Sequence, residues 1–243
     1  MPEGGEVDPQ RLVADLAKLS PDWHGHGLLS QKATSAIARN ANRPTLHSME
    51  TGAGRSTILL SNLSADHTVF TIANDSLQAA LDSPLTRRER IHVVPGPTQV
   101  TLPGHEFAAP LDLALLDGPH GYPFPDLEYF FVYPHLATGA LLVIDDIHIP
   151  TINNMFRFLS EDAMFEVVEV VDTTGFLRRT DAPVFPAHED GWWTQSYNYS
   201  RFPISGWPAW GGLRPRVRNL VPRPVRQIAK RAVPSRIRLW FRT

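Results

Sequence analysis

The chain has 243 residues, 42% of them hydrophobic, which is enough to bury one core of the size usual for an α/β sheet domain. It has no cysteine, which excludes disulfides, thiolate zinc sites and cysteine nucleophiles, so any metal must be held by oxygen or imidazole ligands. The net charge of −2 hides an asymmetry, because all 25 acidic residues lie in residues 1–200 while residues 201–243 hold 11 of the 23 Lys and Arg.

In chain order, the hydrophobic spacing predicts helices over 9–20 and 30–41, the second with Ser30 as its N-cap. Strands and helices then alternate. The expected strands cover 45–50, 67–75, 90–96, 111–118 and 140–147, the expected helices cover 56–63, 76–83, 127–136 and 150–162, and an antiparallel pair over 165–173 and 175–180 closes the pattern. Near-continuous apolar strands separated by helices indicate a doubly wound, mostly parallel α/β sheet, in which ligands bind beyond the carboxyl ends of the strands.

The alternation stops after residue 182. We expect a sheet domain over 1–182, an irregular C-terminal extension rich in aromatic residues and proline over 183–212, and a basic tail over 213–243. The tail suits an acidic face of its own domain, a neighbouring subunit of a homo-oligomer or an anionic membrane surface, whereas nucleic acid is disfavoured because no recognition motif accompanies the charge. The acidic N-terminus and the lack of a membrane-spanning apolar run predict a cytoplasmic, at most membrane-peripheral, protein.

A glycine turn closes the first strand, in the stretch Glu50-Thr51-Gly52-Ala53-Gly54-Arg55-Ser56-Thr57. Gly52 and Gly54 let the backbone approach a ligand closely, and the amides at the start of the next helix face that ligand. A carboxylate at Glu50 would repel a pyrophosphate but suits the cationic methionine end of S-adenosylmethionine, and Thr57 stands where a dinucleotide motif has its third glycine. The expected cofactor contacts are Glu50, Thr51, Gly52, Ala53, Gly54, Ser56 and Thr57.

The second strand is expected to end at Asp75, where a carboxylate can accept both ribose hydroxyls of an adenosine. Asp75 could also serve as the N-cap of the helix over 76–83, and both roles can hold at once. After the third strand, the turn over 95–99 could lie against an adenine, although an ordinary loop is the better interpretation.

Acids and histidines follow the next two strands of the sheet. The fourth strand ends in Asp117-Gly118-Pro119-His120, and the fifth in Asp145-Asp146-Ile147-His148. Buried carboxylates need a partner, and because there is no lysine between positions 32 and 230 we expect a divalent metal, Mg²⁺ or Mn²⁺, at Asp117, Asp145 and Asp146. Asp117 also lies beside the expected cofactor. Alternatively, one of the two adjacent acids caps the helix that begins at Pro150.

The segments ETGAGRST, LDLALLDGPHGYP and GALLVIDDI, with Asp75, together resemble class I S-adenosylmethionine-dependent methyltransferases, in particular the branch with Asp-Gly-x-His-x-Tyr after the fourth strand. The resemblance covers residues 30–180. It implies a Rossmann-like sheet of seven strands with the last one reversed, and cofactor contacts at Glu50, Gly52, Gly54 and Asp75. Against the metal-dependent O-methyltransferases of this class, Asp117 and Asp145 match the metal-binding acids, Asp146 replaces an amide, and His120 replaces the catalytic lysine.

The predicted reaction is O-methylation of a small-molecule hydroxyl, on a sugar or a natural-product scaffold, at a metal held by Asp117 and its neighbours. His120 would accept the hydroxyl proton, because imidazole is the side chain whose ordinary pKa lies nearest neutrality. His148 is a metal ligand, a second base or a histidine bonded to backbone. The rivals are an NAD(P)-dependent reductase and a non-catalytic membrane-peripheral binding protein. His24 and His26 could belong to a lid, although a surface loop is favoured.

Overall fold

The structure is a computed structural model that describes residues 8–19, 29–184 and 195. His24, His26, the basic tail over 213–243 and most of the extension over 183–212 lie outside the described residues.

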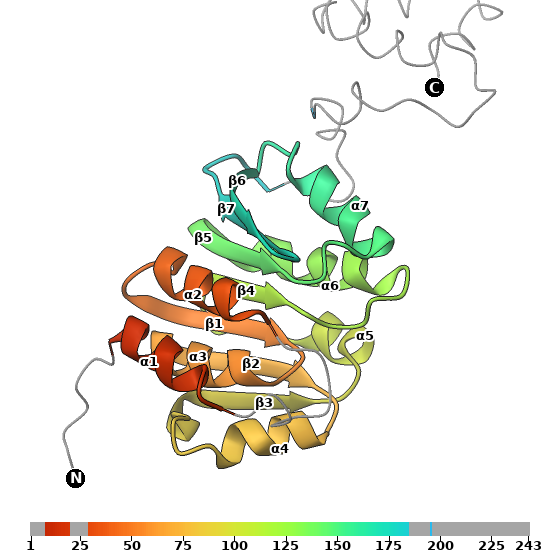
Figure 1. Ribbon diagram of the computed structural model, residues 1–243. Helices are drawn as coiled ribbons and strands as arrows, with labels where there is room; N and C mark the ends of the chain where they lie inside the picture. Colours follow the sequence, from red (N-terminus) through yellow and green to blue (C-terminus); the bar gives the residue numbers. More distant parts are fainter. Residues whose placement is uncertain (1–7, 20–28, 185–194, 196–243) are drawn as a thin grey trace, which may run out of the picture. The chain divides into compact units, whose positions relative to one another are not determined.

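Seven strands form one sheet in the order β3-β2-β1-β4-β5-β7-β6 (Figure 1). Neighbouring strands among β1 to β5 are parallel, whereas β7 runs antiparallel to both β5 and β6. This confirms the predicted mostly parallel sheet with its last strand reversed. The strands are β1 (Thr45–Thr51), β2 (Ser64–Thr71), β3 (Ile91–Pro95), β4 (Leu111–Leu116), β5 (Leu136–Ile144), β6 (Phe165–Val171) and β7 (Thr174–Arg179).

Two groups of helices cover the sheet. The first group is α1 (Pro9–Leu16), α2 (Gln31–Asn40), α3 (Arg55–Leu63) and α4 (Asp75–Asp82), and the second is α5 (Thr98–Thr101), α6 (Phe124–Val132) and α7 (Pro150–Leu159). Short 3₁₀ turns follow at η2 (Arg88–Arg90), η3 (Leu102–Gly104) and η4 (Tyr133–His135). Among the described helices, none combines the length and the apolar character that a membrane span requires.

The core follows from the alternation of side chains along the central strands. Leu113 and Leu141 point to one face, where they join a buried cluster with Leu12 of α1, Ile37 of α2 and Leu59 of α3. The intervening residues of the same strands point to the opposite face, and they are also buried. Burial on both faces explains why these strands are mostly apolar, and it leaves the strand ends as the place for polar chemistry.

Local hydrogen bonds correct several predicted boundaries. Ser30 caps α2 as expected, accepting a hydrogen bond from the amide of Ala33 at 3.1 Å. The prediction that β2 extends to residue 75 is wrong, because β2 ends at Thr71 and the chain then turns into α4. Asn74 rather than Asp75 caps α4, since its Oδ1 accepts from the amide of Leu77 at 2.9 Å.

Candidate active site

The glycine loop between β1 and α3 lies against the end of β4. Gly52 has a φ of +94°, and a Cβ at this position would stand 2.7 Å from the carbonyl oxygen of Asp117. Its amide donates to the carbonyl of Phe70 at 2.9 Å, which ties the loop to β2 as well. Only glycine combines this left-handed backbone with such a close approach. At Gly52 the loop therefore meets the acid after β4 through its backbone.

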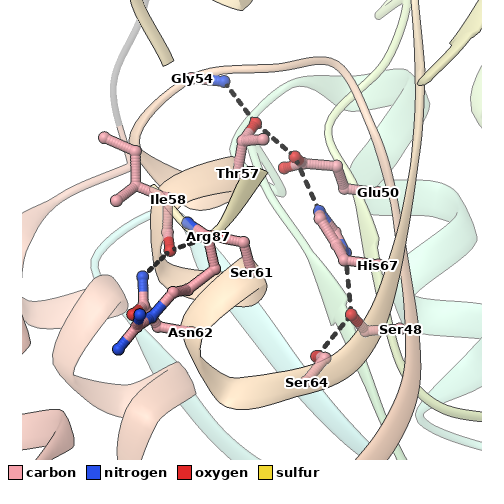
Figure 2. A network of polar contacts seen from close by, with 10 residues as sticks. All are labelled: Ser48, Glu50, Gly54, Thr57, Ile58, Ser61, Asn62, Ser64, His67 and Arg87. Atoms are coloured by element: carbon pink, nitrogen blue, oxygen red, sulfur yellow. Dashed lines mark hydrogen bonds and ion pairs between the residues drawn. The ribbon is translucent and has the colours of Figure 1, made fainter. Parts of the chain in front are cut away.

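Glu50 points into the protein beneath this loop (Figure 2). Its Oε1 accepts a hydrogen bond from Thr57 Oγ1 at 2.5 Å, and Thr57 Oγ1 in turn accepts from the amide of Gly54 at 3.0 Å. Its Oε2 is buried and has no hydrogen-bond partner within the described residues. The sequence predicted a carboxylate that faces a ligand. In the structure Glu50 is instead buried, and its hydrogen bonds hold the glycine loop in place.

The network continues through β2 to His67, which sequence reasoning missed. His67 Nε2 lies 3.1 Å from Glu50 Oε1, and His67 Nδ1 lies 2.8 Å from Ser48 Oγ, which accepts from Ser64 Oγ at 2.6 Å (Figure 2). All of these side chains are buried. The signal was available, because a histidine and serines inside apolar strands must find partners.

The remaining side chains of the loop are occupied in the same way. Thr51 Oγ1 donates to Glu128 Oε2 at 2.8 Å and accepts from the amide of Asp117 at 3.0 Å. Ser56 is buried, whereas Gly52 and Ala53 remain partly exposed. A ligand would therefore meet this loop chiefly through its backbone.

Asp75 lies in the first turn of α4 with an exposed side chain. The described residues supply no hydrogen bond or ion pair to its carboxylate, and Asn74 has taken the capping role. The structure therefore removes the N-cap interpretation and leaves the carboxylate free at the carboxyl edge of the sheet.

Three side chains from the loops after β4 and β5 come together at the carboxyl edge of the sheet. Asp117, His120 and Asp146 each offer an oxygen or nitrogen atom within 4.8 Å of the other two. His120 Nε2 lies 3.2 Å from Asp146 Oδ2, and His148 Nδ1 lies 3.5 Å from Asp146 Oδ1. Asp146 adopts a φ of +55°, a left-handed conformation that aspartate tolerates better than most residues. The turn at Asp146 thereby places one carboxylate between two imidazoles.

Asp145 is not part of this group. It is buried, its Oδ1 accepts from Thr174 Oγ1 at 2.6 Å, and its amide donates to the carbonyl of Leu116 at 3.1 Å. Of the predicted metal ligands, Asp117 and Asp146 come together, and His120 takes the place expected for Asp145. The capping alternative is wrong for both acids, because Ile149 is the N-cap residue of α7 and no side chain caps that helix.

The electrostatics of the group are dominated by uncompensated negative charge. Burial, followed by repulsion from Asp145 and Asp146, raises the pKa of Asp117 well above its ordinary value. Burial also raises the pKa of Asp145, against the hydrogen bond from Thr174. Within the described residues, no lysine or arginine forms an ion pair with any of these acids. Such a cluster favours bound protons or a bound cation.

Glu128 on α6 is a second buried acid that sequence reasoning missed. It is 3% exposed, and burial raises its pKa to about 7 against the opposing effects of the Thr98 and Thr51 side chains. Its Oε1 has no hydrogen-bond partner in the described part of the chain, and a Cβ on Gly118 would stand only 1.9 Å from that oxygen. Glu128 is thus a buried group beside Asp117 that titrates near neutrality.

Comparison with known proteins follows this geometry. A family model described as a methyltransferase domain matches residues 25–147, just over half of the chain. No curated protein matches the chain in sequence. The O-methyltransferase TomG from Streptomyces achromogenes, involved in tomaymycin synthesis and solved with S-adenosylmethionine, is 13% identical over 72% of this chain and 92% of its own, with a TM-score of 0.55.

Two further solved structures share the fold. The O-methyltransferase from Bacillus cereus, in complex with S-adenosylhomocysteine, is 11% identical over 74% of this chain and 93% of its own, with a TM-score of 0.53. The MycE methyltransferase from the mycinamycin biosynthetic pathway, in complex with Mg and S-adenosylhomocysteine, is 14% identical over 75% of this chain and 58% of its own, with a TM-score of 0.51. The family match includes the glycine loop and the acids after β4 and β5, and it decides against a reductase. The chain therefore belongs to the methyltransferase domain family, as a class I S-adenosylmethionine-dependent methyltransferase.

Proposed function

We propose that this methyltransferase transfers its methyl group to a hydroxyl oxygen of a small molecule. The observation that carries the proposal is the His120–Asp146 pair, which stands beside Asp117 at the same edge of the sheet as the glycine loop. An imidazole oriented by a carboxylate is suited to removing a proton from an attacking hydroxyl. TomG and MycE serve the synthesis of tomaymycin and mycinamycin, which supports a sugar or natural-product scaffold as the acceptor.

The residues fit S-adenosylmethionine at three places. The partly exposed backbone of Gly52 and Ala53 is open to close approach, because no Cβ stands at Gly52. The unpartnered Oε2 of Glu50 is buried beneath the loop, so it would accept a hydrogen bond from the cofactor's ammonium group through a bridging water. The free carboxylate of Asp75 would accept the ribose hydroxyls. When bound, S-adenosylmethionine supplies an electrophilic methyl group on a sulfonium.

His120 is proposed as the general base. Its side chain is 45% exposed, so an acceptor hydroxyl can reach the ring, while Asp146 fixes the ring's orientation. As the hydroxyl proton passes to the imidazole, the carboxylate of Asp146 stabilises the imidazolium that forms. His148, on the other side of Asp146, is the alternative base.

The donor set of Asp117, Asp146 and His120 also fits a divalent cation such as Mg²⁺ or Mn²⁺. A bound cation would lower the pKa of an acceptor hydroxyl that it contacts. The Nε2 atom of His120 decides between the two arrangements. It can donate its hydrogen to Asp146, which leaves Nδ1 to accept the hydroxyl proton, or it can ligate a cation, but it cannot do both. If the cation occupies Nε2, the base would be His148.

The experiment combines cofactor binding with turnover. Isothermal titration should show that wild type and His120→Ala bind S-adenosylmethionine equally well. Turnover of a hydroxylated acceptor, found by mass spectrometry of a metabolite panel, should fall about 10²-fold or more in His120→Ala. His92→Ala, on the exposed edge strand β3, is the matched control and should keep the wild-type rate. Wild type that binds no S-adenosylmethionine, or His120→Ala that remains active, would contradict the proposal.

The metal is tested separately with the same acceptor. If the cation is required, EDTA should abolish turnover, and Mg²⁺ or Mn²⁺ should restore it. In that case His148→Ala should also lose activity, because the base role moves to that ring. A rate that EDTA leaves unchanged assigns the chemistry to the His120–Asp146 pair alone.

A further inference from the structure

A cavity of about 280 Å³ lies at the amino ends of β1 and β2, whereas the glycine loop and the acids of the candidate site lie at the carboxyl ends of the strands. Arg43 lies just before β1, Ser64 begins β2, and Arg87 and Arg90 lie at the two ends of the η2 segment that leads into β3. Because β1, β2 and β3 are parallel, this edge is separated from the glycine loop by the length of β1, roughly 20 Å for a strand of this size. The cavity is therefore distinct from the site described above.

Positive charge is concentrated around this cavity. Residues 1–200 hold 25 acids but only 12 Lys and Arg, yet three of those 12 line one cavity whose described lining includes no carboxylate. Arg43 Nη2 donates to the carbonyl of Ala38 at 3.2 Å, and Arg90 Nη1 donates to the carbonyl of Ser64 at 3.1 Å. These acceptors are neutral, and in the described residues none of the three guanidinium groups forms an ion pair. Their charge is left without a counterpart.

The walls of the cavity are held in place by hydrogen bonds. Asn62 Nδ2 donates to the carbonyl of Leu85 at 2.8 Å. It also donates to the carbonyl of Ile58 at 2.8 Å, and the amide of Arg87 donates to Ser61 Oγ at 3.3 Å (Figure 2). Arg87 therefore starts from a fixed backbone, while its guanidinium retains all of its donors. A guanidinium matches the geometry of phosphate oxygens bidentately, which a lysine cannot do.

We propose that this cavity binds a small, soluble anion that carries phosphate groups, such as a phosphate ester or a diphosphate. Three arginines that line one cavity supply the charge that such a ligand requires. The volume is near the lower end of the range for small-molecule pockets, which fits a compact ligand. This site is independent of the methyl transfer proposed above.

The probe for this site is pyrophosphate, titrated calorimetrically at constant ionic strength into the full chain with S-adenosylmethionine present in excess. Wild type should bind it saturably. Arg87→Gln should weaken the affinity about tenfold or more, because hydrogen bonds to a charged group are lost. Arg88→Gln is the matched control, since Arg88 belongs to the same η2 turn but does not line the cavity, and it should leave the affinity unchanged.

Thermal denaturation checks that the variant folds. Arg87→Gln should melt at the wild-type temperature, because no described side chain depends on the Arg87 guanidinium. Lack of saturable binding by wild type overturns the proposal, and so does an equal loss in Arg87→Gln and Arg88→Gln, which would indicate only a diffuse field. Binding that appears only when Glu3 and Glu6 are replaced by Gln would assign the cavity to the chain's own acidic N-terminus. Arg87-dependent binding to phosphatidic acid vesicles, without binding of pyrophosphate, would assign the cavity to a lipid surface. Assignment to the N-terminus or to a lipid surface would each overturn the proposal of a soluble ligand.

Discussion

His67 Nε2 lies 3.1 Å from Glu50 Oε1, and both side chains are fully buried between β1, β2 and the glycine loop. The same carboxylate oxygen accepts a hydrogen bond from Thr57 Oγ1, which in turn accepts one from the amide of Gly54. Only two side chains thus separate the imidazole from the backbone of the glycine loop at Gly54. His67 is accordingly a positioning residue for the loop rather than a group that touches substrate.

Replacing His67 tests this relationship. His67→Phe keeps a ring of similar size but removes the imidazole contacts of Glu50 and Ser48, so the protein should lose about 1–3 kcal/mol of stability and bind S-adenosylmethionine more weakly. His67→Gln retains a donor and should recover part of both losses. Urea unfolding and calorimetry measure them, with His92→Phe at the exposed sheet edge as control. Native stability and affinity in His67→Phe would show that the network has no role in the loop.

Gly52 and Gly104 form a matched pair of glycines. Gly52→Ala faces a φ of +94° and a carbonyl oxygen 2.7 Å from the new Cβ, whereas a Cβ on Gly104 would meet nothing within 4 Å. The left-handed backbone alone should cost about 1–2 kcal/mol, and the contact with Asp117 adds to it. Gly52→Ala should therefore lower both stability and cofactor affinity, while Gly104→Ala should change neither. Equal behaviour of the two variants in calorimetry and denaturation would contradict the proposed close approach.

Glu128 makes the stability of the domain depend on pH. Its pKa in the folded protein is about 7, above the ordinary value of 4.5, so the folded state holds the proton more tightly than the unfolded state. Stability should therefore fall as pH rises from 4.5 through 7, by about 3 kcal/mol at most. Glu128→Gln should be more stable than wild type at pH 8 and nearly equal to it at pH 4.5. Urea unfolding of both proteins at both pH values measures the effect. A stability difference between the two proteins that is the same at pH 4.5 and pH 8 would contradict this prediction.

Most of the sheet could be predicted from the sequence, because apolar runs and turn residues are local signals. The sequence pattern predicts all seven strands and the antiparallel pairing of the last two, which the structure confirms. The end of β2 was misplaced because Ile72 and Ala73 continue the apolar run, although the Asn74 cap has already turned the chain. Such a boundary depends on one hydrogen bond that hydrophobicity does not encode.

The side-chain partners in the site were harder to predict, because they come from distant segments. Asp145 and Asp146 are equivalent in sequence, yet Thr174 engages the first and the left-handed turn directs the second to His120. Glu128 lies in an apolar helix, and its partner Thr51 lies far away in the sequence, at the end of β1. The glycine loop was recognised, but the burial of Glu50 depends on His67 across the sheet.

Asp146 is the residue whose replacement best separates the two arrangements of the site. Asn tolerates a left-handed backbone as Asp does, so Asp146→Asn should fold normally while removing the charge that stabilises an imidazolium on His120. If His120 is the base, turnover should fall about 10²-fold whether or not Mg²⁺ is added. Asp172→Asn is the control, because Asp172 has a similar φ of +52° but lies in the β6–β7 turn, beside Ser30 and Lys32. An amide oxygen can still ligate a cation, so turnover that Mg²⁺ restores in Asp146→Asn would show that Asp146 acts through a metal and not through His120.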